Sequence, residues 1–197
     1  CAAHLFGCDQ LGRDILSRTL EGAGATLAIA LAVLAVGALA GLAVGALCGY
    51  HGGAADALVM RLCDAVAAFP SVLLALVVLA VTGPGKYNVI AALGVLFVPS
   101  FARLVRGEFL KYRDRDFVRS AKLIGVSDLR IIFVHILPNI VSVILVTVTL
   151  DFASCMLTES SLSYLGFGVQ LPRPTWGNML NGSRNALVIQ SYWWRWL

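Results

Sequence analysis

The feature that most constrains the fold is an uncharged run of 22 residues, 26–47, with the sequence TLAIALAVLAVGALAGLAVGAL. An α-helix rises about 1.5 Å per residue, so about 20 apolar residues cross a hydrocarbon core about 30 Å thick. The run is internal, lacks a basic start and is too long for the apolar part of a signal peptide. The chain is therefore predicted to be an integral membrane protein.

Other apolar runs follow the first one. The chain is 59% hydrophobic and 13% charged, whereas soluble domains have about 45–50% apolar and about 25% charged residues. Backbone groups in lipid must be hydrogen-bonded internally, which leaves helices or closed barrels. Barrel strands alternate apolar and polar residues, and these runs do not. We expect an all-α, polytopic membrane helical bundle. The predicted spans are residues 24–49, 65–82, 87–106 and 131–157.

The basic residues predict the orientation. Eight of the fifteen Lys and Arg residues lie between positions 103 and 130, and such clusters beside spans stay in the cytoplasm. The loop 107–130 is therefore predicted inside. Residues 1–22, with a possible interfacial helix, and residues 158–192 are predicted outside. Acidic residues interrupt the basic ones, which argues against a phosphate-tracking groove and so against nucleic-acid binding.

Residues 23–197 are predicted to form one transmembrane domain. The segment 191–197 contains Trp193, Trp194 and Trp196, which resemble the aromatic belt at a membrane surface. Such a belt usually leads into a further span. We therefore expect a fragment that lacks the first and last spans of the bundle.

The five cysteines and three histidines show no spacing typical of a metal site. Cys48, Cys63 and Cys155 are expected to pack as small apolar residues. Cys1 and Cys8 are both predicted outside, so a disulfide between them is left open.

Glycines recur at every fourth position of the first predicted span, at Gly37, Gly41, Gly45 and Gly49. This spacing places them on one face of a helix, where small residues allow a second helix to approach closely. The neighbour is either a helix of the same chain, which we favour, or another subunit.

Prolines interrupt the later spans. Each proline removes a backbone donor and bends its helix, and a bent helix is able to line a cavity. The predicted hinges are Pro70, Pro99 and Pro138.

The charged loop contains a predicted short amphipathic helix over residues 117–124. Phe117, Ala121 and Ile124 share one face, with Val118 flanking it. Gly125 follows as the stop, because glycine adopts the left-handed conformation at little cost. A second helix is predicted to start with Ser127 as its cap and Asp128 in its first turn. The short helix suits insertion into a groove on a soluble partner or a position on the inner membrane surface, and periodicity alone does not decide.

Four motifs in order resemble one known family. Ala121, Gly125, Leu137 and Pro138 match the cytoplasmic "EAA" loop of ABC importer permeases, and the longer pattern from Phe117 to Asn139 is similar to the peptide/nickel branch. Residues 5–18, 49–76 and 160–180 also resemble motifs of that branch. The sequence departs from the family at Cys8, usually a threonine, and at Arg119 and Ser120, which replace a glutamate and an alanine. Asp116 is a candidate to compensate for Arg119.

The resemblance implies a type I ABC importer permease fold with six spans, in a bacterial or archaeal plasma (inner) membrane. Such permeases pair with a second homologous permease chain, two cytoplasmic ATPases and an extracytoplasmic substrate-binding protein. The chain itself is expected to be non-catalytic and without a cofactor, because ATP and Mg belong to the ATPases and the segment TGPGKY lacks the pattern of a P-loop. The expected ATPase-coupling residues are Asp116, Phe117, Val118, Ala121, Ile124, Gly125, Ser127 and Asp128.

Two acidic residues in the last span are candidates for the translocation path. Ionisable groups at membrane depth are functional candidates by default, so Asp151 and Glu159 either meet the substrate or, as the alternative, pair or cap near the outer boundary. Short peptides are the expected substrate, with nickel or another small solute as the alternative. A secondary transporter or channel driven by an ion gradient is the competing class.

Overall fold

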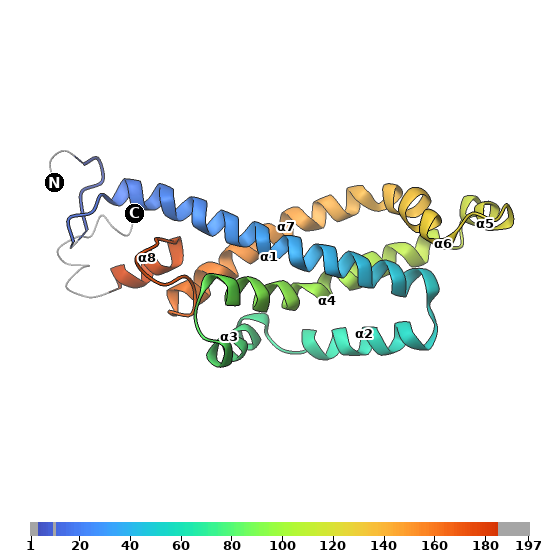
Figure 1. The fold of residues 1–197 in the computed structure, drawn as a ribbon, viewed down its shortest axis with the longest axis horizontal. Helices are drawn as coiled ribbons and strands as arrows, with labels where there is room; N and C mark the ends of the chain where they lie inside the picture. Colours follow the sequence, from blue (N-terminus) through green and yellow to red (C-terminus); the bar gives the residue numbers. More distant parts are fainter. Residues whose placement is uncertain (1–3, 10, 185–197) are drawn as a thin grey trace. The chain divides into compact units, whose positions relative to one another are not determined.

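The computed structural model describes residues 4–9 and 11–184, and within them the regular secondary structure is helical apart from one antiparallel bridge between Cys8 and Asp14 (Figure 1). The predicted all-α class is confirmed. Trp193, Trp194, Trp196 and Cys1 lie outside the described residues, whereas Cys8 is disulfide-bonded. The elements are α1 (Ile15–His51), α2 (Gly53–Ala67), α3 (Ser71–Thr82), α4 (Lys86–Tyr112), α5 (Asp116–Leu123), α6 (Asp128–Arg130), the π-helix η1 (Ile131–Ile136), α7 (Leu137–Tyr164) and α8 (Trp176–Ser183).

Three helical segments of the described chain are long and apolar enough to cross a membrane, namely Ile15–His51, Lys86–Tyr112 and Asp128–Tyr164. They contain the predicted spans 24–49, 87–106 and 131–157 and are longer than each of them. The predicted span 65–82 is not one helix, because the chain breaks at residues 68–70 between α2 and α3. Helices α2 and α3 together are apolar enough for a fourth, broken span. The depth of each segment in the membrane stays a prediction.

The chain divides into two compact units. Unit 1 comprises Cys1–Val33, Val72–Ala92 and Ala153–Leu197, and unit 2 comprises Leu34–Ser71 and Leu93–Phe152. Helices α1 and α7 contribute to both, and each unit is described below by itself.

Unit 1 joins the start of α1 to the end of α7 and to α8. Helix α1 begins at Ile15, earlier than the predicted span, because the Asp14 carboxylate accepts a hydrogen bond from the Ser17 backbone N–H at 3.1 Å and so caps the first turn. Farther along, the Cys155 sulfur of α7 lies 3.8 Å from the Ala30 carbonyl oxygen of α1. The Trp176 indole N–H of α8 donates to the Thr19 carbonyl of α1 at 3.3 Å.

Unit 2 is organised by the glycine face of α1, which packs against α4. A Cβ atom added at Gly37 would lie 2.8 Å from the Phe97 Cβ, and one at Gly49 would lie 2.6 Å from the Phe109 Cβ. Gly41 and Gly45 meet α4 residues in the same way. The neighbour predicted by the glycine spacing is therefore a helix of the same chain, as favoured from the sequence.

The three prolines occupy different environments. Pro70 lies at the break before α3, whereas Pro99 lies inside the continuous helix α4. Pro138 follows η1, where the Leu137 N–H bonds to the Ile132 carbonyl in a wider, five-residue turn. The Asn139 side chain donates to the His135 carbonyl at 2.6 Å, which satisfies one of the carbonyls near the proline. Their role as moving hinges stays a prediction.

The packing of α1 on α4 predicts a position-dependent cost of adding one methyl group. In Gly45→Ala the new Cβ would lie 2.5 Å from the Ala102 carbonyl oxygen and 2.8 Å from the Val105 Cβ. We expect a loss of about 1–3 kcal/mol in stability, because the backbone of α4 must shift. The melting temperature of the purified protein in detergent measures it.

Gly24→Ala is the matched control, because Gly24 lies in the same helix and its Cβ would meet nothing within 4 Å. Equal melting temperatures for Gly45→Ala and Gly24→Ala would contradict the close packing.

Candidate functional site

Helix α5 ends in a glycine turn whose geometry matches the sequence-based expectation. Gly125 has φ +82°, in the left-handed region. Its N–H donates to the Lys122 carbonyl at 3.0 Å, and the Val126 N–H donates to the Ala121 carbonyl at 3.0 Å. This pair of bonds is the Schellman motif, which closes the end of a helix and turns the chain sharply. The helix stop predicted at Gly125 is confirmed.

The apolar side chains of α5 divide between the interior and the surface. Val118 and Ala121 are buried, in a cluster with residues of α1, α4 and η1. Phe117 is 42% exposed and Ile124 is 80% exposed. The predicted face is therefore divided: Ala121 is buried with Val118, whereas Phe117 and Ile124 are exposed, and Ile124 follows the end of the helix.

Leu123 is an exposed apolar residue that the sequence analysis did not select. Its side chain is 88% exposed on the last turn of α5. With Phe117 and Ile124 it forms a set that we name the exposed apolar set. Exposed apolar residues grouped on a charged loop indicate an interaction surface. The signal in the sequence was the pair Leu123–Ile124 directly before the glycine stop.

The turn after α5 differs from its predicted cap. Ser127 occupies the N-cap position of α6 with an extended backbone, but its side chain makes no capping hydrogen bond. The Asp128 carboxylate instead accepts a hydrogen bond from the Tyr50 hydroxyl of α1 at 2.5 Å. The predicted cap by the Ser127 side chain is therefore wrong, and a contact with a distant helix holds the turn.

The charged groups of α5 are exposed. Asp116 lies in the first turn, where a carboxylate is favoured by the helix dipole. Within residues 4–9 and 11–184 no ion pair joins Asp116 to Arg119. The proposed compensation of Arg119 by Asp116 is not observed.

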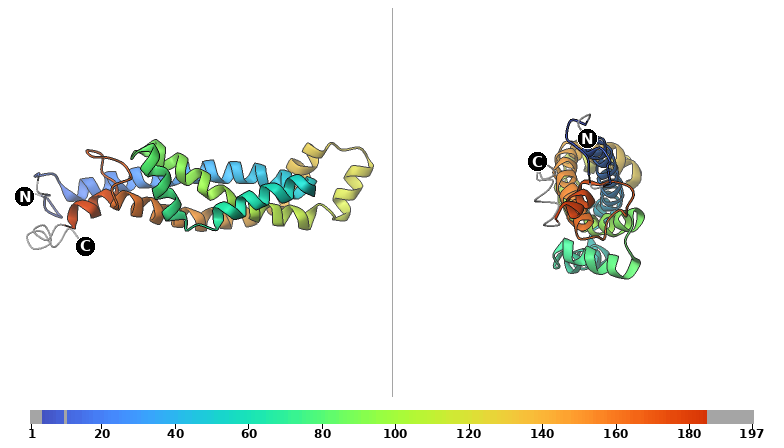
Figure 2. Two further views of the ribbon diagram at one scale, coloured as in Figure 1. Left: turned by 90° about the horizontal axis from the view of Figure 1, so that it is seen from below. Right: turned by 90° about the vertical axis from the view of Figure 1, so that its left-hand side faces the viewer.

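Figure 2 shows α5 between the end of α4 and the start of α6.

Two ion pairs connect α2 to α4. Arg106 donates two hydrogen bonds to Asp56, at 2.5 and 2.7 Å, and the Asp56 side chain is 8% exposed. Arg103 lies 3.3 Å from Asp64, in a more exposed pair. Arg103 and Arg106, expected in or beside the loop, are thus on a helix and bind the neighbouring one. The signal in the sequence was the presence of opposite charges on two adjacent apolar segments.

The predicted hinge Pro99 borders a small cavity of unit 2. The cavity has a volume of about 240 Å³ and is also lined by Phe69, Ser71, Ser100 and Arg103. Pro99 and the residues at the break between α2 and α3 therefore line the same cavity.

The two acidic path candidates lie in different units. Glu159, in unit 1, is fully buried, and one carboxylate oxygen accepts a hydrogen bond from the Ser163 hydroxyl at 2.7 Å. The other Glu159 oxygen and one oxygen of Asp151 have no hydrogen-bond partner among the described residues. Neither residue lines the cavity beside Pro99 or the larger cavity of unit 1 that is described next. Their role in a translocation path stays a prediction.

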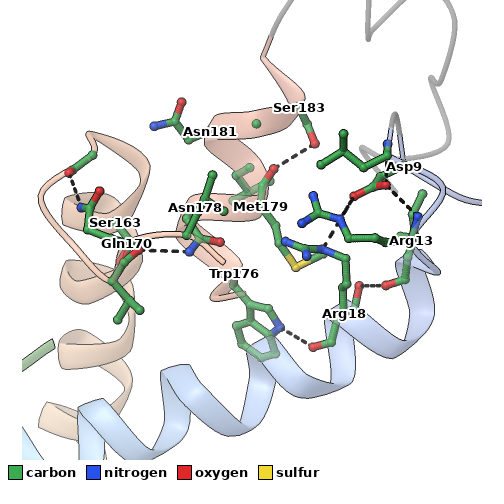
Figure 3. Close-up of a pocket in the computed structure, with 18 residues that line it drawn as sticks. Asp9, Arg13, Arg18, Ser163, Gln170, Trp176, Asn178, Met179, Asn181 and Ser183 are labelled. Atoms are coloured by element: carbon green, nitrogen blue, oxygen red, sulfur yellow. Dashed lines mark hydrogen bonds and ion pairs between the residues drawn. The ribbon is translucent and has the colours of Figure 1, made fainter. Parts of the chain in front are cut away.

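A larger cavity of about 680 Å³ lies in unit 1, between the segment before α1 and α8 (Figure 3). Figure 3 shows Asp9 and Arg13 on one side of it and Gln170 on the opposite side. Helix α8 is held there by a capping box, in which Thr175 and Asn178 exchange hydrogen bonds. The sequence does not predict this cavity, because the cavity depends on contacts between the segment before α1 and helix α8, which lie far apart in the chain.

Asp9 organises the turn before α1. Its carboxylate accepts hydrogen bonds from the Leu11 N–H at 2.9 Å and from the Arg13 Nε at 2.6 Å, and Arg18 lies 3.9 Å away. Burial raises the pKa of Asp9, but the hydrogen bonds from Arg13 and Leu11 and the charge of Arg13 hold the pKa below its usual value. The Ser17 hydroxyl hydrogen bond likewise lowers the pKa of Asp14.

The helices, the broken apolar pair and the charged loop define a polytopic membrane protein. Residues 41–191 match the family described as binding-protein-dependent transport system inner membrane component. The chain belongs to this family of inner membrane components, which confirms the resemblance to ABC importer permeases.

Three curated relatives that are similar to the chain share one name. The chain is 49% identical over 186 residues to the glutathione transport system permease protein GsiD of Escherichia coli and to that of Shigella boydii. The protein of the same name from Shigella dysenteriae is 48% identical over 186 residues. Each alignment covers 94% of this chain and 61% of the relative, so the chain spans about three fifths of their length.

The lowered pKa of Asp9 predicts an acid-sensitive turn. A carboxylate with a depressed pKa contributes stability above the pKa of the unfolded chain, and that stability is lost as the pH falls toward the folded value. We expect the hydrogen-exchange protection of the Leu11 and Arg13 amides to fall between about pH 5 and about pH 3. In Asp9→Asn the protection should be lower at the upper pH and no longer depend on pH.

Asp114→Asn is the control for the loss of one carboxylate, because the Asp114 side chain is 66% exposed. It should leave both amides unchanged. Protection in the unaltered protein that stays constant over this pH interval would contradict the role of Asp9.

Proposed function

We propose that the chain is the transmembrane permease subunit of an ATP-driven importer for short peptides and forms half of the translocation path. A second homologous permease chain supplies the other half, two cytoplasmic ATPases supply the free energy, and an extracytoplasmic binding protein delivers the substrate. ATP and Mg bind to the ATPases, and the permease catalyses no reaction. The lipid bilayer surrounds the helices.

Coupling to the ATPase is assigned to residues 117–125. The observation that supports it is the exposed apolar set, with Phe117 and Leu123 on α5 and Ile124 directly after it, in the loop that the basic residues predict inside. A helix on a membrane surface would also place apolar residues outward. The Schellman turn favours coupling to the ATPase over a position on the membrane surface. It fixes the direction in which the chain leaves α5 toward η1, so that α5 and η1 are able to move together.

The mechanism is an exchange between two conformations of the permease. A ligand shifts such an equilibrium only by the difference in its affinity for the two states. ATP bound between the ATPases supplies this difference, and α5 transmits it to the helices that contain or adjoin Pro70, Pro99 and Pro138. Asp151 and Glu159 are the residues of the path that are proposed to meet polar groups of the substrate.

The substrate class rests on the relatives. Glutathione, which their names give as the transported substrate, is itself a short peptide with free carboxylates and an amino group. We therefore propose short peptides of this kind rather than nickel or another small solute. The binding protein performs most of the selection.

The glycine turn offers the direct test of the coupling role. In Gly125→Val the side chain meets no atom within 4 Å of its Cβ, so the cost arises from the left-handed backbone, about 1–2 kcal/mol or more. We expect co-purified ATPase and peptide uptake by membrane vesicles both to fall by about fivefold or more.

Gly107→Val is the matched control, because its Cβ also meets nothing within 4 Å and no left-handed backbone is involved. Unchanged co-purification and unchanged uptake in Gly125→Val would refute the docking role. Uptake by the unaltered protein that follows a sodium or proton gradient without ATP would instead support a secondary transporter or channel.

A further inference from the structure

Tyr50, on the last turn of α1, contacts two parts of the charged loop at once. Its hydroxyl donates a hydrogen bond to the Asp128 carboxylate at 2.5 Å, across 78 positions of the chain. The Lys122 ammonium lies 4.7 Å from the centre of its ring, within the range of a cation–π contact. One side chain of α1 therefore binds α5 through Lys122 and α6 through Asp128.

The ring of Tyr50 is also part of the apolar cluster beneath α5. Tyr50 is 6% exposed and belongs to the same cluster as Val118 and Ala121 of α5 and Ile131 and Ile132 of η1. The ring therefore belongs to the buried cluster that also contains Val118 and Ala121 of α5 and the start of η1. Its position is set by the glycine face of α1, which holds this helix against α4.

The covalent structure gives α1 no direct link to the loop. Helix α5 is joined along the chain to α4 on one side and to α6, η1 and α7 on the other. A displacement of α5 reaches these helices through the backbone, but it reaches α1 only through non-covalent contacts. Besides Tyr50, the end of α1 meets α4 through the close packing of Gly49 on Phe109 and through a long hydrogen bond of 3.5 Å from Arg113 to the Gly49 carbonyl. Neither of these contacts reaches α6.

We propose that Tyr50 is the positioning residue that couples α5 to α1. Its hydroxyl and ring hold α1, α5 and α6 as one body, so that a movement of α5 is delivered to α1 together with α4 and α7. Without this link, α1 would follow α5 only through its packing against α4, so less of the movement would reach α1 and more ATP would be hydrolysed for each substrate imported. This inference rests on the proposed function, because it requires that an ATPase moves α5.

The test removes the hydroxyl and keeps the ring. Tyr50→Phe retains the apolar packing and the Lys122 contact but loses the bond to Asp128. In proteoliposomes with ATPase and binding protein, we expect unchanged co-purification of the ATPase and an increase of about threefold or more in ATP hydrolysed per substrate imported. A merely structural role would lower melting temperature and co-purification together and leave this ratio unchanged.

Two further variants keep the proposal testable if Tyr50→Phe folds poorly. Asp128→Asn weakens the same interaction, because a neutral amide oxygen is a poorer acceptor than a carboxylate, so it should raise the ratio by no more than Tyr50→Phe does. The double variant Tyr50→Phe/Asp128→Asn should raise it no further than Tyr50→Phe alone, because both changes act on one interaction. Tyr112→Phe is the control, since Tyr112 packs against the same cluster and its hydroxyl makes no hydrogen bond among the described residues. It should keep the ratio of the unaltered protein.

The outcomes separate this inference from the proposed function. A normal ratio in both Tyr50→Phe and Asp128→Asn overturns the role of Tyr50 and leaves the docking of α5 untouched. Additive effects in the double variant also overturn it. If the unaltered protein imports without ATP or binds no ATPase, the proposed function fails and this inference fails with it.

Discussion

The close approach of α1 and α4 is the constraint on which the rest of unit 2 depends. Glycines at every fourth position leave α1 without side chains on the face where α4 packs, and an added Cβ would meet α4 backbone or Cβ atoms there. This packing brings the end of α1, with Tyr50, to the end of α4. Tyr50 in turn lies beside Asp128 and under Lys122. The placement of the charged loop therefore follows from a contact made within the apolar helices.

The sequence predicted the parts of the loop that local backbone rules control. Gly125 ends α5 because its left-handed conformation is cheap only for glycine, and no neighbour is needed to make it so. The burial of Val118 instead of Ile124 was not predictable in this way, because α5 has apolar residues on most sides and its neighbours decide which are covered. Likewise, the carboxylate of Asp128 binds a tyrosine 78 positions away rather than serving a local cap.

The same distinction applies to the charges. The positive-inside rule used Arg103 and Arg106 as loop residues, whereas the structure places both on α4, paired with carboxylates of α2. The pairing of Arg106 with the buried Asp56 carboxylate is favoured, because an unpaired charge in an apolar environment would lower the stability of the fold. Basic residues near a span thus serve helix packing as well as orientation. Sequence patterns gave the class of the protein, and contacts over long sequence separations gave the arrangement of its site.

The central claim is that the exposed apolar set of α5 meets the ATPase. Leu123 is its most exposed member at 88%, and Leu5, in the segment predicted outside, is equally exposed at 88%. A photo-reactive amino acid at position 123, in membranes that contain the assembled importer, measures the claim directly. The account predicts a cross-link from position 123 to the ATPase subunit and none from position 5. Cross-links from position 123 to lipid alone, or to no second protein, would contradict it.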